Sequence, residues 1–370
     1  MTTWPVNEGC VMDPHHKLRA SCARSLSLYA PQHRTPAAAP ARWAAATIEP
    51  DSYGEGGVVR AVENEVASLL GKPAAVFMPT GTMAQQIALR VHADRRPSRT
   101  VLFHPLCHLE RNEERAFEHL HGLVGCPVGS ADRLLCLADL QAVSGPLAAL
   151  VLELPQRMIG AQLPPWSDLL AQTSWARDRG AAAHLDGARL WEAQPFYGRT
   201  HAQIAELFDT VYVSFYKGLG GIGGCALAGP EDDIEQARLW RTRHGGLMFS
   251  MWPYAADALY GLTVELPAMG ERLEHARSLA AELAARPGVE ILPDPPQTPI
   301  FNVVIDRSPR QLDAARARIA AQDGVWMFDR MWPTDSSEVT RIEFALGRQL
   351  ADFAAGEIVA LFDRLHELAA

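Results

Sequence analysis

The chain lacks long hydrophobic runs and cysteine motifs. Its longest strongly apolar run, Leu147 to Leu154, is far shorter than the about 20 residues that a membrane helix needs. The six cysteines show no C-x-x-C spacing, which favours reduced thiols. The first eight residues contain neither a basic nor an apolar stretch, so we expect no secretory signal. Together these absences predict a cytoplasmic enzyme without a membrane segment.

The chain also has fewer positively than negatively charged residues. The 370 residues include 34 Lys and Arg against 43 Asp and Glu, a net charge of -9, and no stretch is densely basic. Nucleic acid and anionic membranes are therefore not expected as partners. A hydrophobic fraction of 48% and a mean hydropathy of -0.06 are typical of a globular protein. The length is enough for about two domains.

Sequence texture divides the chain into three expected parts. Residues 1–45 lack clear periodicity and end in an Ala/Pro-rich stretch, so we interpret them as an arm that packs on something else, such as a second subunit. Residues 46–268 are expected to form a large domain. Residues 269–370 are expected to form a smaller α+β domain, with a long Ala/Leu/Glu helix over 271–286 and strand-like runs at 300–305 and 339–346.

Short apolar runs alternate with helical patterns in the large domain. Ala84, Ile87, Ala88 and Val91 show the i, i+3, i+4, i+7 spacing of one helix face. The expected strands are residues 74–78, 100–104, 148–154, 181–185, 210–215 and 225–228. This alternation predicts an α/β fold with a mostly parallel sheet covered by helices on both faces. Ligands of such sheets bind outside the carboxyl ends of the strands.

Lys217 closes one expected strand and is followed by a glycine-rich run. Gly218, Gly220 and Gly223 match the G-x-G-x-x-G dinucleotide fingerprint, but that fingerprint must open a helix, and here the chain continues into another expected strand. A partly desolvated lysine at a strand end has a lowered pKa and a reactive neutral amine. The alternative is an ordinary solvated lysine before a turn.

Asp186 closes the preceding expected strand, one strand-helix-strand step before Lys217. A parallel crossover brings both residues to the same edge of the sheet. An aspartate and a lysine there suit pyridoxal phosphate (PLP), whose aldehyde takes the lysine and whose pyridinium nitrogen takes the carboxylate. A structural ion pair of Asp186 with Arg or Lys is the alternative.

Thr80, Gly81 and Thr82 follow the first expected strand and open a helix. Backbone N–H groups and hydroxyls at such a helix start form an anion site, although an N-cap threonine alone gives the same pattern. No metal site is expected, because the pair His15 and His16 lacks spaced partner ligands.

These segments together resemble one family. Tyr53-Gly54, Pro79 to Thr82, His108, His184 to Arg189 and Lys217 to Gly220 occur in the order and rough spacing of the threonine aldolase and β-eliminating lyase family. The resemblance covers residues 51–248 well and the C-terminal domain weakly. It implies PLP fold type I, with a large domain and a smaller C-terminal domain, and pyridoxal 5′-phosphate as the cofactor.

The resemblance also implies roles at the cofactor. Lys217 would bind it covalently, Asp186 would hold its pyridine nitrogen protonated, and the ring of His108 would stack on its face. The phosphate would be held by Thr80, Gly81 and Thr82. An amino acid would be the substrate, and Arg189 would bind its α-carboxylate.

Further substrate contacts are implied for Arg341, in the small domain, and for Tyr53, which would reach into a neighbouring subunit's site, since the family builds its sites across a dimer interface. A homodimer or homotetramer is therefore expected. Where aldolases carry a histidine near the β-hydroxyl, this chain has Gln156, which can hydrogen-bond but cannot take a proton. His108, or a water that it holds, is then the expected base, and Glu113 is a second candidate.

The expected reaction is cleavage of a β-hydroxy-α-amino acid to glycine and an aldehyde, with the cofactor ring as electron sink. β-Elimination, or another reaction that deprotonates Cα, is the alternative on the same scaffold. A PLP-binding protein without catalysis is a remote alternative, which the presence of Lys217, Asp186 and Arg189 argues against.

Overall fold

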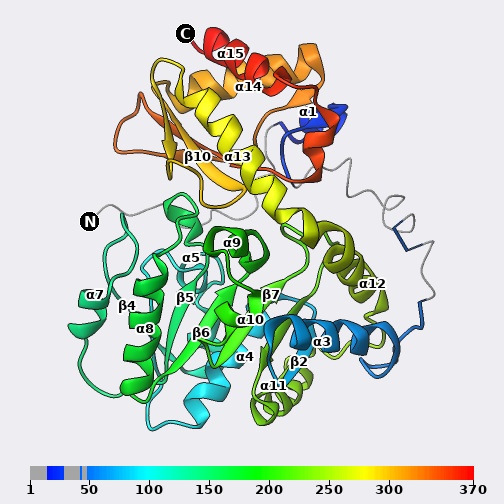
Figure 1. Cartoon of the computed structure of the whole chain (residues 1–370), viewed down its shortest axis with the longest axis vertical. Coiled ribbons are helices and arrows are strands. Elements are labelled where there is room, and N and C mark those ends of the chain that lie inside the picture. Colours follow the sequence, from blue (N-terminus) through cyan, green and yellow to red (C-terminus); the bar gives the residue numbers. More distant parts are fainter. Residues whose placement is uncertain (1–14, 29–41, 44–47) are drawn as a thin grey trace. The chain divides into compact units, whose positions relative to one another are not determined.

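The structure is a computed structural model, and it describes residues 15–28, 42–43 and 48–370. The chain forms two compact units (Figure 1). The larger unit comprises residues 37–270, and the smaller unit combines residues 271–370 with the N-terminal residues up to 36. Within the described ranges, no helix is both long and apolar enough to span a membrane.

The larger unit is built on a seven-stranded sheet with the order β2-β8-β7-β6-β5-β3-β4. Only β8 runs against its neighbours among these described strands. The mostly parallel sheet predicted from the sequence is thus confirmed. The strands are β2 (Ala74–Met78), β3 (Thr100–Phe103), β4 (Val124–Pro127), β5 (Ala149–Glu153), β6 (Ala182–Gly187), β7 (Thr210–Ser214) and β8 (Cys225–Gly229).

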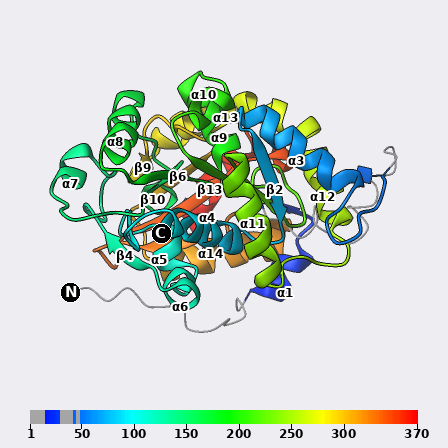
Figure 2. The ribbon, with the colours of Figure 1, turned by 90° about the horizontal axis from the view of Figure 1, so that it is seen from below.

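Helices cover both faces of this sheet (Figure 2). One face carries α4 (Gly81–Asp94) and α11 (Glu231–Arg243), and the other carries α3 (Gly57–Leu70), α8 (Trp166–Asp178) and α12 (Trp252–Tyr260). Shorter helices complete the unit: α5 (His108–Arg111), α6 (Ala116–His121), α7 (Leu137–Gln141), α9 (Leu190–Tyr197) and α10 (His201–Ala205). The alternation of strands and helices expected from the sequence therefore corresponds to a central sheet with a helical layer on each face.

The smaller unit contains an antiparallel sheet with the order β12-β13-β10-β9. Its strands are β9 (Val289–Leu292), β10 (Ile300–Ile305), β12 (Met331–Pro333) and β13 (Thr340–Ala345), and its helices are α13 (Met269–Ala284), α14 (Pro309–Asp323) and α15 (Glu357–Leu368). The sequence predicted β10, β13 and the helix over 271–286, but not β9 or β12.

Residues 15–28, which we assigned to an N-terminal arm, lie in this smaller unit. They form helix α1 (His16–Ser21) and strand β1 (Arg24–Ser25), which pairs in parallel with β11 (Val325–Trp326). Arg24 forms an ion pair of 2.7 Å with Glu357, and Arg19 forms one of 3.0 Å with Asp329. The rest of the expected arm lies outside the described residues, apart from residues 42–43.

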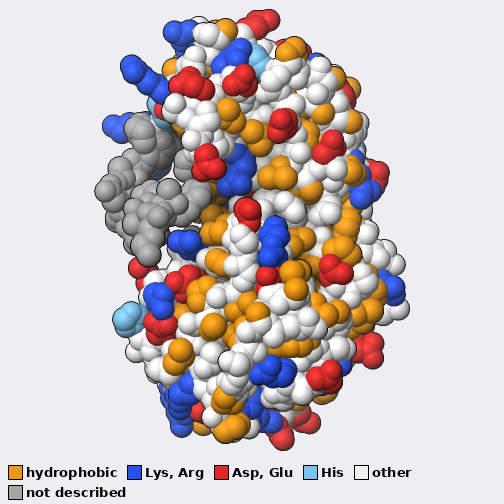
Figure 3. Space-filling model, turned by 90° about the vertical axis from the view of Figure 1, so that its left-hand side faces the viewer, with side chains coloured by type: hydrophobic (Ala, Val, Ile, Leu, Met, Phe, Trp, Pro, Cys, Tyr) orange, Lys and Arg blue, Asp and Glu red, His pale blue; other side chains and the backbone are white. Residues whose placement is uncertain are grey.

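Charged side chains of both signs are interspersed over the face drawn in Figure 3, with hydrophobic side chains between them. This mixture agrees with the modest net charge of -9.

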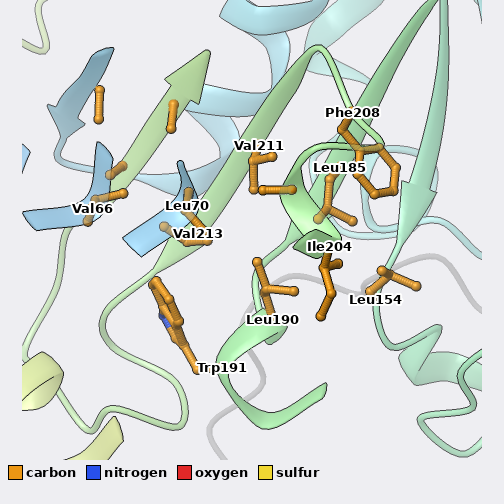
Figure 4. Packing of buried hydrophobic residues seen from close by; sticks show 14 of the residues in the cluster. Val66, Leu70, Leu154, Leu185, Leu190, Trp191, Ile204, Phe208, Val211 and Val213 are labelled. Carbon is orange, nitrogen blue, oxygen red and sulfur yellow. The ribbon is translucent and has the colours of Figure 1, made fainter. Parts of the chain in front are cut away.

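Strand residues that alternate along β6 and β7 point to opposite faces of the sheet. Leu185, Val211 and Val213 belong to the hydrophobic core that also includes Val66 and Leu70 of α3 (Figure 4). The residues between them, His184, Asp186 and Tyr212, therefore face the other side, where α4 packs. That alternation decides which side chains reach the candidate site.

Candidate active site

Asp186 and Lys217 come together at one edge of the sheet. Strands β6 and β7 are parallel neighbours, with Asp186 opposite Tyr212 in register, and Lys217 follows the end of β7. The two side chains are close enough for Asp186 to act on the pKa of Lys217. The prediction that a crossover brings both residues to the same edge is therefore confirmed.

The Lys217 side chain is buried, with 8% of the residue exposed. Burial, followed by the positive charge of Arg189, lowers the pKa of Lys217 to about 8, although Asp186 and Glu153 oppose that shift. Its Nζ atom lies 5.5 Å from the centroid of the Tyr216 ring. A lysine with this pKa offers a neutral, nucleophilic amine near physiological pH. The interpretation of Lys217 as a solvated surface lysine is wrong.

The Asp186 carboxylate is buried and held from two directions. Its Oδ1 accepts a hydrogen bond of 3.1 Å from the Ala188 N–H, and its Oδ2 accepts one from the side-chain amide of Gln85. Gln85 lies in the second turn of α4 and is itself buried. Sequence reasoning missed Gln85, because its partner is supplied by the packing of α4 on β6.

A second carboxylate, Glu153, lies directly opposite Asp186 at the end of β5. Burial, and then the negative charge of Asp186, raise the pKa of Glu153 to about 7. Gln156 Nε2 donates to Glu153 Oε2 at 3.3 Å, and the Arg157 N–H donates to Glu153 Oε1 at 3.4 Å. The sequence offered one signal for Glu153, its position near the end of the expected strand 148–154.

Gln156 is buried, and its amide faces protein atoms on two sides. Besides Glu153, its Nε2 contacts the carbonyl oxygen of Leu106 at 3.3 Å. Arg157, the next residue, is also buried, and its positive charge helps to lower the pKa of Lys217. The role of Gln156 in binding substrate stays a prediction, but the structure places its segment beside the lysine.

Thr80, Gly81 and Thr82 lie where β2 passes into α4, at the same sheet edge. Thr80 is the N-cap of α4, and its side chain accepts a hydrogen bond of 3.3 Å from the Met83 N–H. A side chain added at Gly81 would bring its Cβ within 2.0 Å of the Tyr212 hydroxyl oxygen. Close backbone approach at a helix start is typical of a phosphate site.

His108 and Glu113 form a hydrogen-bonded pair. The His108 Nδ1 lies 2.8 Å from Glu113 Oε1, and the Glu113 side chain is only 2% exposed whereas that of His108 is 36% exposed. Burial raises the pKa of Glu113, and the hydrogen bond to His108 opposes this. A carboxylate on Nδ1 leaves Nε2 of the neutral ring able to accept a proton. Glu113 is therefore directed at His108.

The glycine run after Lys217 leads into strand β8 and not into a helix. The rejection of a dinucleotide fingerprint is thus confirmed. A Cβ at Gly218 would lie 2.3 Å from the Glu192 carboxyl carbon, and one at Gly221 would lie 2.7 Å from the Phe215 carbonyl oxygen. These glycines let the loop pack closely behind Lys217.

The remaining predicted site residues occupy different places. Arg189 is buried at the N-cap of α9 and acts on the pKa values of Lys217, Glu153 and Glu192. Tyr53 is 54% exposed, with its ring edge-on to Phe249 at 5.3 Å between centroids. Arg341 lies on β13 of the smaller unit. The roles of these three residues stay predictions.

Solved structures share this architecture. The crystal structure of a protein provisionally named an L-allo-threonine aldolase, from Listeria monocytogenes EGD-E, matches with a TM-score of 0.90 and 36% identity over 95% of this chain and 98% of that one. A threonine aldolase from Leishmania major shares the fold, with a TM-score of 0.70 and 20% identity over 94% of this chain and 100% of that one. The class that the fold and the lysine–aspartate site define is that of fold type I PLP enzymes.

Sequence comparison gives the family. The model of the β-eliminating lyase family matches residues 32–307, and the chain belongs to that family. A curated relative, the aldolase vrtJ of Penicillium aethiopicum, is 32% identical over 250 residues, which are 65% of this chain and 63% of that protein. The chain thus spans less than two thirds of that relative's length. The resemblance stated from the sequence is confirmed.

Proposed function

We propose that this protein is a PLP-dependent lyase that cleaves a β-hydroxy-α-amino acid into glycine and an aldehyde. The observation that carries the proposal is the pairing of a buried lysine of lowered pKa with a buried carboxylate at the ends of neighbouring parallel strands. The family match and the aldolase names of the relatives support the same activity. The name of the family also covers β-elimination.

The residues present fit the cofactor. Lys217 forms no ion pair with a carboxylate within the described residues, so its amine is available to an aldehyde. Asp186, fixed by Gln85 and Ala188, supplies the negative charge that a protonated pyridine ring needs. The phosphate would be held by Thr80, Gly81 and Thr82 at the start of α4. When bound, the cofactor supplies an electron sink for the bond that breaks.

The chain's own residues supply binding and proton transfer. The Arg189 guanidinium would bind the substrate's α-carboxylate. Arg189 and Arg157 also keep the Lys217 amine from holding a proton tightly, through their positive charges. Burial of Lys217 and Asp186 excludes water and strengthens these electrostatic effects.

His108 is the proposed base for the β-hydroxyl proton. Its Nδ1 is engaged by Glu113, which orients the ring and stabilises the positive charge that forms when Nε2 takes a proton. Gln156, where aldolases carry a histidine, cannot accept that proton. If His108 only stacks on the cofactor, another group, with Glu113 as the second candidate, must take the β-hydroxyl proton. The absence of a histidine at Gln156 keeps β-elimination as the second candidate reaction.

Tyr53 supports an oligomeric enzyme. Its exposed ring packs against Phe249, which is 68% exposed, so two large aromatic residues lie together on the surface of the larger unit. Exposed aromatic clusters are typical of subunit interfaces. We therefore expect a homodimer or homotetramer in which Tyr53 enters a neighbouring site.

A product analysis tests the proposal. The purified enzyme, loaded with PLP, is incubated with a panel of β-hydroxy-α-amino acids, and the products are identified by mass. Glycine with an aldehyde is the expected result, and Lys217→Ala serves as the inactive control. Ammonia with a keto acid would show that the reaction is β-elimination and not aldol cleavage. Absence of both product sets would overturn the assignment as a lyase.

A further inference from the structure

Asp186 stands at the end of a continuous row of buried hydrogen-bonded side chains. Gln85 contacts Asp186 with its amide nitrogen, and its Oε1 lies 2.8 Å from His184 Nε2. The His184 Nδ1 lies 2.7 Å from the Thr210 hydroxyl, which lies 2.7 Å from His92 Nε2. All five residues are at most 2% exposed. We call this row, Asp186–Gln85–His184–Thr210–His92, the Asp186 relay.

Three elements of the larger unit supply the relay. Gln85 and His92 lie on α4, His184 and Asp186 lie on β6, and Thr210 begins β7. His184 and Asp186 are two residues apart in one strand, so both point to the face that α4 covers. Thr210 lies opposite His184 in the parallel pairing of β6 with β7. The sheet register therefore places the relay between the sheet and α4, with Asp186 of the candidate site at one end.

The carboxylate determines the direction of every hydrogen bond in the relay. An ionised Asp186 can only accept, so Gln85 must donate with Nε2 and must accept with Oε1. His184 must then carry its proton on Nε2, and its Nδ1 must accept from the Thr210 hydroxyl. The Thr210 hydroxyl donates its only proton to His184, so its oxygen can only accept from the second histidine. His92 must therefore donate from Nε2. With an ionised Asp186, only one orientation of each group satisfies all the hydrogen bonds of the relay.

Both histidines of the relay are neutral at physiological pH. Burial lowers the pKa of His184 to about 3 and that of His92 to about 3. The charges of Arg96 and Arg95 add to the effect at His92, whereas Asp186 opposes it at His184. The relay therefore keeps its direction near neutral pH.

We propose that the Asp186 relay keeps the Asp186 carboxylate ionised and aimed at the ring nitrogen of the cofactor, with Gln85 and His184 as positioning residues. This proposal rests on the proposed function of the site. Hydrogen bonds donated to a carboxylate stabilise its charged form. Two other carboxylates, Glu153 and Glu113, interact electrostatically with Asp186. The hydrogen-bond donors to Asp186 offset the repulsion between these carboxylates.

Several other titratable groups also face Asp186. Lys217 approaches from the loop after β7, Tyr212 and Tyr216 from β7 and its end, and Cys107 from the segment before α5. Of these, only Lys217 carries a positive charge near neutral pH, and its amine is the group that the cofactor takes. Without Gln85, a proton shared between Asp186 and the ring nitrogen would move towards the carboxylate. The ring would then lose the charge that makes it an electron sink.

Histidine tautomers in the cofactor-free protein give the first test. The Thr210 carbonyl near His184 favours a proton on Nδ1 and so opposes the tautomer that the relay requires. In ¹⁵N NMR spectra of protein with labelled histidine, we expect both His184 and His92 as the Nε2–H tautomer. The Nδ1–H tautomer at His184 would overturn the proposal.

Asp186→Asn is the matched perturbation for that test. The Ala188 N–H holds the Asn oxygen, so the Asn amide group faces Gln85 and forces the Gln85 amide to turn round. His184 and His92 should then both change to the Nδ1–H tautomer. Unchanged tautomers in this variant would show that the carboxylate does not set the direction of the relay, and would overturn the proposal.

The cofactor-loaded protein gives the second test. With ¹⁵N-labelled pyridine nitrogen, Gln85→Met should move the ring resonance towards that of the unprotonated ring and lower kcat about 10- to 100-fold, with little change in KM. The Gln side chain in His184→Gln can accept from Thr210 and donate to Gln85, so this variant should keep the ring resonance of the parent protein. His184→Leu can do neither, so its ring resonance should move as in Gln85→Met.

Gln86→Met is the control for packing. Gln86 is buried beside Gln85 on the same helix but takes no part in the relay. A structural role alone predicts that Gln85→Met and Gln86→Met lose stability with the ring resonance unchanged in both, and this result would overturn the proposal. The two resonance tests need no substrate, so they stand even if the enzyme proves to catalyse a different cleavage.

Discussion

Glu153 and Asp186 lie side by side in register at the ends of β5 and β6, and both carboxylates act on the lysine whose pKa is lowered to about 8. One of them, Asp186, receives donors from Gln85 and Ala188, whereas burial and Asp186 raise the pKa of Glu153 to about 7. Glu153 can therefore hold or release a proton near neutral pH, beside the carboxylate proposed to face the cofactor ring.

Covalent capture of the cofactor should occur on Lys217. The purified protein should be yellow with PLP, and borohydride reduction followed by peptide mapping should place the label on this residue. Lys72, whose pKa burial also lowers, is the natural comparison because it lies in the same unit. Label on Lys72 or on another lysine, or a protein that takes up no PLP, would contradict the assignment.

The rate of that capture should depend on pH. Only the neutral amine attacks an aldehyde, so in the cofactor-free enzyme the rate should rise with pH through about 8 and then level off. Stopped-flow absorbance measures it. Arg157→Gln removes a positive charge and should move the midpoint upwards, whereas Glu153→Gln removes a negative charge and should move it downwards. Shifts of the same sign in both variants would refute this account of the lysine.

Asp186→Asn should retain much of the cofactor but lose most turnover. An amide carries no charge to hold a proton on the ring nitrogen, and each pKa unit lost there corresponds to about 1.4 kcal/mol of differential stabilisation. Absorbance of the bound cofactor and kcat report the two effects separately. Near-normal turnover would remove Asp186 from its proposed role.

His108→Phe separates stacking from proton transfer, because it keeps a flat ring and removes the nitrogen that takes the proton. We expect cofactor binding to persist and aldol cleavage to fall by about 10²–10⁴-fold. Glu113→Gln keeps the size of the side chain and loses the charge behind Nδ1, so its effect should be smaller than that of His108→Phe. Unchanged cleavage by His108→Phe would exclude this histidine as the base.

Gly81→Ala should destabilise the protein by about 1–3 kcal/mol, since the new Cβ would lie 2.0 Å from the Tyr212 hydroxyl oxygen. Thermal unfolding of the cofactor-free protein measures the change. Tyr212→Phe removes that oxygen and should recover part of the loss when it is combined with Gly81→Ala. No recovery in the double variant would show that the Tyr212 hydroxyl is not what restricts position 81.

The sequence predicted the parts of this protein that depend on local pattern. Lys217 and Asp186 could be placed because each ends an apolar strand, and the parallel crossover between those strands follows general rules. Strand β4 was missed because it is a short edge strand that contains Gly125 and ends at Pro127. Gln85 and Glu153 could not be assigned roles, since these arise only when α4 and β5 pack against β6.

The pairing of β1 with β11 joins residues 24 and 25 to residues 325 and 326. The larger unit is continuous in sequence, so a ribosome releases all of it before residue 325 is made. The smaller unit needs both ends of the chain and must close a very long loop, which is slow and entropically costly. During synthesis, the strand pairing of Arg24 and Ser25 must wait, and the larger unit can fold first.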